Sequence, residues 1–194
     1  MEPQSAEAAF RAIWVAPSII LGLGITRLGS DAVSLFRSRH RARIDWIPLL
    51  WAACIFVWQI QYLWAIIELP HFVRTWTLPE FLMLLSLSLA LFVAAALVFP
   101  DKELRISEAL EDDFLRDGRW ALVALSAWGY TAALVDFWLF AEPLLSPDVG
   151  LMVVVATVPL LYLATKQRRL RAFITVGNLA LTLWVAWVLS PNAY

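Results

Sequence analysis

Two ionisable side chains lie within the first long apolar segment, one helical turn apart. Arg27 and Asp31 are separated by four residues, a spacing that places both side chains on one face of a helix. A charged side chain near the centre of a membrane helix costs at least ~2.5 kcal/mol, so this pair has to face protein or water. Two interpretations stay open, a structural ion pair or part of a polar path through the protein.

Other polar residues lie at comparable depth in later apolar segments. Asp136 is 17 residues into its segment, and a carboxylate at such a depth is a candidate for either structural pairing or a functional site. Asn178 shares one face of the last segment with Thr175 and Thr182 by their spacing of three and four residues. We expect Asn178 at the depth of Arg27, whose second partner besides Asp31 is either Asn178 or backbone carbonyls of a neighbouring helix. The candidate pore or substrate-binding residues are Arg27, Asp31, Gln61, Glu68, Asp136 and Asn178.

Gln61 and Glu68 fall on one stripe of the second segment with three other residues, Trp51, Cys54 and Trp58. Gln59 and Gln61 are two residues apart, so at most one of them can face the interior of a helical bundle. Glu68 lies at the end of its segment, where a carboxylate can also reach water. It is therefore either a solvated boundary residue or part of an acidic mouth.

Small and hydroxylated residues recur every fourth position along the first segment. Ser18, Gly22, Thr26 and Ser30 form this stripe, and such a stripe lets another helix approach closely within a membrane. We interpret these four residues as helix-packing candidates, and we expect the rest of the chain to pack around this helix.

The sequence lacks the usual signatures of membrane enzymes. Its two histidines, His40 and His71, fall in predicted loops on opposite sides of the membrane, and Cys54 is the single cysteine. Haem ligation by two histidines within the bundle and an internal thiol–disulfide relay are therefore excluded. No nucleotide-binding or hydrolase motif is present. We expect no enzymatic activity, no cofactor and no metal.

The composition indicates an integral membrane protein. Of 194 residues, 61% are hydrophobic and only 16% are charged, whereas soluble domains average about 25% charged residues. We predict an all-α fold, a polytopic bundle of six transmembrane helices that forms a single domain over residues 1–194. The predicted spans are 9–36, 46–67, 79–99, 119–142, 149–165 and 171–190.

Basic residues predict the orientation of these spans. Twelve of the 15 Lys and Arg residues lie in or beside the three connections after the first, third and fifth spans. The positive-inside rule makes these connections cytoplasmic and both termini external, in a plasma or inner membrane. The acidic loop 100–118 then faces the cytoplasm. The acidic start of the chain lacks the basic region of a cleaved signal peptide, so we expect the first segment to be retained.

These features favour a channel or carrier for ions or small solutes. Six helices enclose little water, so we expect a pore to need a homo-oligomer. The alternative is a non-catalytic accessory, scaffold or sensory subunit that binds a partner membrane protein through the first span. The lipid bilayer is the expected environment, and topology explains the basic loops without nucleic acid.

Overall fold

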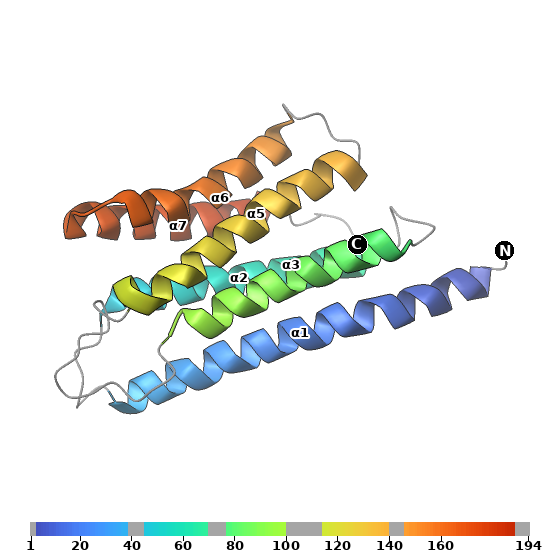
Figure 1. Ribbon diagram of the computed structural model, residues 1–194, viewed down its shortest axis with the longest axis horizontal. Helices are drawn as coiled ribbons and strands as arrows, with labels where there is room; N and C mark the ends of the chain where they lie inside the picture. Colours follow the sequence, from blue (N-terminus) through green and yellow to red (C-terminus); the bar gives the residue numbers. More distant parts are fainter. Residues whose placement is uncertain (1–2, 39–44, 70–76, 100–113, 140–145, 189–194) are drawn as a thin grey trace.

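The computed structural model of the chain describes residues 3–38, 45–69, 77–99, 114–139 and 146–188. These residues are 94% helical and include no strand. The helices are α1 (Pro3–Ser38), α2 (Trp46–Glu68), α3 (Leu78–Leu97), a short π-helical turn η2 (Phe114–Gly118), α5 (Arg119–Leu139), α6 (Pro147–Ala164) and α7 (Arg168–Val188). Figure 1 shows them as long rods that run roughly side by side. The all-helical prediction is confirmed.

Short polar side chains define where three of these helices begin. Asp45 caps α2, because its carboxylate accepts a hydrogen bond of 2.9 Å from the backbone N–H of Ile47. At the start of α3, the carboxylate of Glu80 in the first turn accepts a hydrogen bond of 2.6 Å from the backbone N–H of the N-cap residue Thr77. Ser146 accepts one of 3.3 Å at the start of α6. Each cap satisfies a backbone donor that a helix leaves without a partner at its N-terminus.

Each of the six predicted segments contains one helix, and one of these helices is shorter than a membrane span. Five helices are long and apolar enough to cross a membrane: Trp14–Arg37, Trp46–Glu68, Leu78–Leu97, Phe114–Trp138 and Arg168–Val188. The apolar helix Val149–Ala164, within the segment predicted as 149–165, is shorter. At 1.5 Å per residue it measures about 24 Å, less than the ~30 Å of a hydrocarbon core. Most of the acidic loop 100–118 lies outside the described residues, and only its last part, η2, can be compared.

Helix α1 is not at the centre of the bundle, which corrects the expected arrangement. Helix α1 packs against α3 and α2 and lies along one edge of the molecule, while α6 and α7 lie on the opposite side (Figure 1). The order of contacts continues from α3 to α5, to α6, to α7 and back to α2. Two contacts therefore connect the N-terminal helices to the C-terminal ones, α3 with α5 and α2 with α7.

The stripe of small residues on α1 is largely exposed and does not face the other described helices. The buried residues of α1 include Leu21, Gly24, Leu28 and Leu35, which lie on a different face. Three members of the predicted stripe, Gly22, Thr26 and Ser30, are exposed, and Ser18 is half-buried. Gly22 has no neighbour within 4 Å of the position where a side chain would begin. Among the described residues no helix packs on this face, which leaves it open to lipid or to another molecule.

Candidate functional site in the core of the bundle

One face of α2 fills the space between the C-terminal helices with aromatic side chains. Trp51 and Trp58 are fully buried at a spacing of seven residues, or two helical turns. The Trp51 ring lies edge-on to Tyr162 of α6, with ring centres 5.4 Å apart. The Trp58 ring lies 5.1 Å from that of Trp128 on α5. The interior between these helices is therefore a packed aromatic core in the state that the structure describes.

Three neutral polar residues lie where α2 faces α7. Cys54 belongs to α2, and Asn178 and Thr182 belong to α7. We call Cys54, Asn178 and Thr182 the polar layer. All three are buried, and the Asn178 amide donates a hydrogen bond of 3.4 Å to the Cys54 sulfur. Thr182 lies one turn beyond Asn178 on the same face of α7. The sequence correctly predicted that Asn178 and Thr182 share one face.

Several hydrogen-bonding groups in this region have no partner among the described residues. They include Asn178 Oδ1 and Thr182 Oγ1 on α7, and the indole Nε1 atoms of Trp51 and Trp58 on α2. Leaving such a group buried without a partner costs about 1–3 kcal/mol. The set offers acceptors and donors together, and none of its members carries a charge. Asn178 Oδ1 and Thr182 Oγ1, one turn apart on α7, thus leave an acceptor and a hydroxyl with open hydrogen-bonding capacity.

Gln59, and not Gln61, is the glutamine that faces the N-terminal part of the core. Gln59 is fully buried, and its amide donates a hydrogen bond of 3.4 Å to the carbonyl of Leu91 on α3. The same amide lies against Gly24 of α1, where any side chain would overlap it. Gln59 therefore joins α1, α2 and α3. The sequence predicted that at most one of the two glutamines faces inward, but Gln61 was the one predicted as a candidate site residue.

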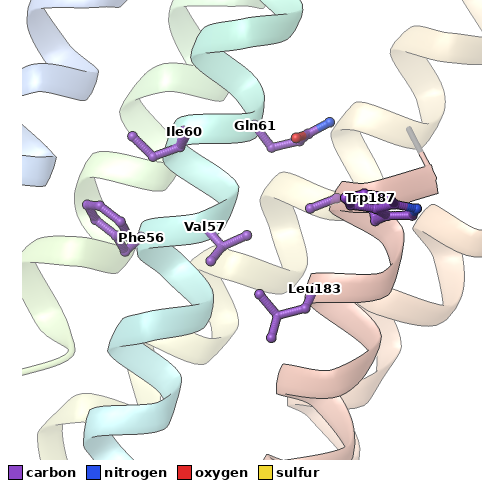
Figure 2. A pocket seen from close by; sticks show the side chains of 7 residues that line it. Phe56, Val57, Ile60, Gln61, Leu183 and Trp187 are labelled. Carbon is purple, nitrogen blue, oxygen red and sulfur yellow. The ribbon is translucent and has the colours of Figure 1, made fainter. Parts of the chain in front are cut away.

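Gln61 lies at a groove on the outside of the bundle between α2 and α7. The groove has a volume of about 330 Å³. Figure 2 shows the Gln61 amide extending toward Trp187, with Val57 and Leu183 further along the two helices. Its lining residues are Phe56, Val57, Ile60, Gln61, Leu183, Ala186 and Trp187. Because this lining is mostly apolar, the groove is suited to contact with lipid chains.

The remaining predicted site residues are distributed over different helices. Arg27 Nε lies 2.8 Å from Asp31 Oδ2, so the spacing predicted this ion pair correctly. Their side chains are 39% and 19% exposed, respectively. The structure pairs Asn178 with Cys54 on α2 and not with Arg27 on α1. Glu68 and Asp136 are half-buried near the C-terminal ends of α2 and α5, and both interact with other residues. The six candidates therefore do not form one cluster.

A second charged contact was missed at the start of α2. The carboxylate of Asp45 that caps this helix also accepts a hydrogen bond from Arg168, the first residue of α7. Three residues later, Arg171 lies over the Tyr162 ring at 5.7 Å and donates to the Thr165 carbonyl at 2.7 Å. These contacts tie α2, α6 and α7 together at the end of the bundle where those basic residues lie. The sequence assigned these arginines only to topology.

Comparison with known proteins assigns no family to this chain. No protein-family model, no curated protein and no solved structure matches the chain. Among the described residues, no group of three or more His, Cys, Asp and Glu side chains could hold a metal ion. Neutral hydrogen bonding in the core is thus the chemistry that the described residues offer.

Proposed function

We propose that this multi-pass membrane protein is a small-solute transporter of the carrier type, with both termini external and the basic connections cytoplasmic. The observation that supports the proposal is the polar layer, which lies about halfway along α7. Asn178 is ten residues after Arg168, or about 15 Å along the helix at 1.5 Å per residue. Carriers bind their substrates near this depth, between helices that rearrange to open one side at a time.

The packed core favours a carrier over a channel formed by one chain. Trp51, Trp58 and Trp128 fill the space in which a pore through the C-terminal helices would have to run. A channel needs a continuous hydrated path, whereas a carrier also adopts closed states in which its binding site is sealed from both sides. Transport would require α7 to move relative to α2.

Reconstitution of the protein into liposomes tests the proposal. The protein should move at least one member of a panel of small charged and uncharged solutes. Asn178→Leu, which removes an amide of the polar layer, should lower that flux about tenfold, since the loss of a buried hydrogen bond costs about 1–1.5 kcal/mol. Val176→Ala is the matched control, because Val176 is exposed on the same helix and should keep the flux.

Asp136→Asn tests the acidic candidate on α5 in the same assay. If the half-buried carboxylate of Asp136 lies at the mouth of the path, this variant should change the rate or the selectivity. The transport proposal fails if no solute crosses faster than in empty liposomes. It also fails if Asn178→Leu and Val176→Ala give the same flux as the unchanged protein.

A second candidate function, an accessory membrane subunit, is favoured by the outer face of α1. Gly22, Thr26 and Ser30 are exposed there, although small residues in membrane helices are typical of helix–helix contacts. This function predicts no flux from the protein alone, together with co-purification of another membrane protein or a second copy. Gly22→Leu should abolish that co-purification, and Leu23→Ala, at an exposed apolar neighbour, should not.

A further inference from the structure

The polar layer combines donors and acceptors in a way that is complementary to an amide or to water. Within the layer, Asn178 Oδ1 can accept a hydrogen bond and the Thr182 hydroxyl can donate or accept one. The indoles of Trp51 and Trp58, one turn to either side of Cys54 along α2, are further donors without a partner among the described residues. The other polar atom of the Asn178 side chain, its Nδ2, already donates a hydrogen bond to the sulfur of Cys54. From this complementarity we propose that the polar layer binds a small uncharged molecule, either water or a small amide such as acetamide. The proposal rests on the transport function and specifies its substrate class.

The absence of an ionised group in the polar layer excludes charged ligands on energetic grounds. A buried ion without a counter-charge loses several kcal/mol of hydration free energy. Arg171 is seven residues before Asn178, about 10 Å away along α7, and it is held by the Thr165 carbonyl and the Tyr162 ring. An uncharged amide loses far less hydration and can satisfy the open hydrogen-bonding groups.

The surrounding rings restrict the size of the ligand. Trp51 and Trp58 are fully buried about one turn before and after Cys54 on α2. Side chains in packed interiors leave few voids larger than a water molecule. A ligand of a few non-hydrogen atoms could be accommodated by small shifts of these rings, whereas a sugar or an amino acid would require the tryptophans to leave.

Cys54 provides a direct reporter, because it is the single cysteine of the chain. Methyl methanethiosulfonate modifies a cysteine when the thiolate attacks the sulfenyl sulfur, a disulfide forms and methanesulfinate leaves. The rate can be followed by intact mass in purified, detergent-solubilised protein. Bound solute should slow this reaction, and the measured quantity is the ratio of the rates without and with solute. Acetamide and acetate are compared because they have nearly the same shape and differ in charge, and urea and guanidinium form a second pair.

Acetamide and urea are expected to slow modification about fivefold at saturation, while acetate and guanidinium leave it unchanged. Thr182→Val, which keeps the shape of the side chain and removes its hydroxyl, should reduce this protection, and Val176→Ala should preserve it. Asn178→Leu should abolish it, and the ratio of rates corrects for any change in the reactivity of Cys54 itself. Equal protection by acetate or guanidinium would overturn the proposal.

Water as the ligand is distinguished by a separate measurement. If no solute protects Cys54, magnetisation transfer from water to the indole N–H of Trp58 should be visible by NMR, with Trp58→Phe identifying the signal. Protection by no solute together with no water contact at this indole would overturn the proposal. Its failure is distinct from that of the transport function: Asn178-dependent flux of an ion would retain transport and reject the uncharged ligand. Protection of Cys54 by acetamide without any flux would retain the uncharged ligand and reject the transport function.

Discussion

The contact between Gly24 of α1 and Gln59 of α2 leads to a sharp prediction about stability. An alanine Cβ at position 24 would overlap the Gln59 amide nitrogen, and it would lie 3.2 Å from the Gln59 side-chain carbon Cδ. Gly22, two residues earlier in the same helix, has no neighbour within 4 Å of the corresponding position. Gly22→Ala should therefore raise the free energy of unfolding by up to about 1 kcal/mol, through the higher helix propensity of alanine.

Gly24→Ala has the same gain in helix propensity but adds two costs. Forcing a methyl group into a packed site costs about 1–3 kcal/mol. Displacing the Gln59 amide from the Leu91 carbonyl, to which it donates a hydrogen bond of 3.4 Å, costs about 1 kcal/mol more. The net expectation is a loss of about 1–3 kcal/mol in the free energy of unfolding.

Unfolding in mixed micelles with increasing SDS, followed by circular dichroism, measures both variants against the unchanged protein. A Gln59→Ala background provides the control, because it removes the overlapping amide. In that background, Gly24→Ala should stabilise the protein about as much as Gly22→Ala does, and the difference is the coupling energy between the two positions. Equal effects of Gly22→Ala and Gly24→Ala in the unchanged protein would refute the packing of α1 on α2 through Gln59.

Four further substitutions test the packing of α5 on α6 and the contact between α2 and α7. Gly129→Ala on α5 would place a Cβ 2.8 Å from Ala156 Cβ and 3.2 Å from Ala156 Cα on α6. This substitution should lower the free energy of unfolding by about 1–3 kcal/mol. Gly150→Ala is the control, because position 150 has no neighbour within 4 Å, and it should not lower the free energy of unfolding. Asp45→Ala removes the cap of α2 and should cost about 1 kcal/mol in the same SDS titration. Arg168→Ala should cost less than Asp45→Ala because the Arg168 side chain is 65% exposed, and exposed ion pairs contribute little.

The sequence predicted the helices well because their determinants are local. Apolar runs of about 20 residues between charged or proline-containing connections predict membrane helices, and the observed bounds of α2 and α3 lie within two residues of the predicted 46–67 and 79–99. The Arg27–Asp31 ion pair was predictable for the same reason, since both partners belong to one turn of one helix. The short apolar helix Val149–Ala164 also agrees with the prediction, since 149–165 is the shortest of the six predicted spans.

The face on which each helix packs could not be predicted, because lipid and core are both apolar. On α1, the outward residues Ile19 and Leu23 are as hydrophobic as the inward residues Leu21 and Leu28. A soluble helix would separate these faces by polarity, and the small-residue stripe was the only remaining contrast. Gln59 and Gln61 posed the same problem on α2, where the residue type is identical and only the neighbouring helices decide which one is buried.

The location of the candidate site follows from the different costs of burying charged and neutral polar groups. The charged candidates Glu68 and Asp136 lie near helix ends, where a carboxylate can reach water or a counter-charge. An amide or a hydroxyl costs only a few kcal/mol when buried, and one hydrogen bond recovers much of it. Asn178 and Thr182 can therefore be placed at mid-depth against Cys54, where a carboxylate would not be tolerated. If the polar layer binds a ligand as we propose, it does so by hydrogen bonds alone, and for that reason its substrates should be found among uncharged molecules.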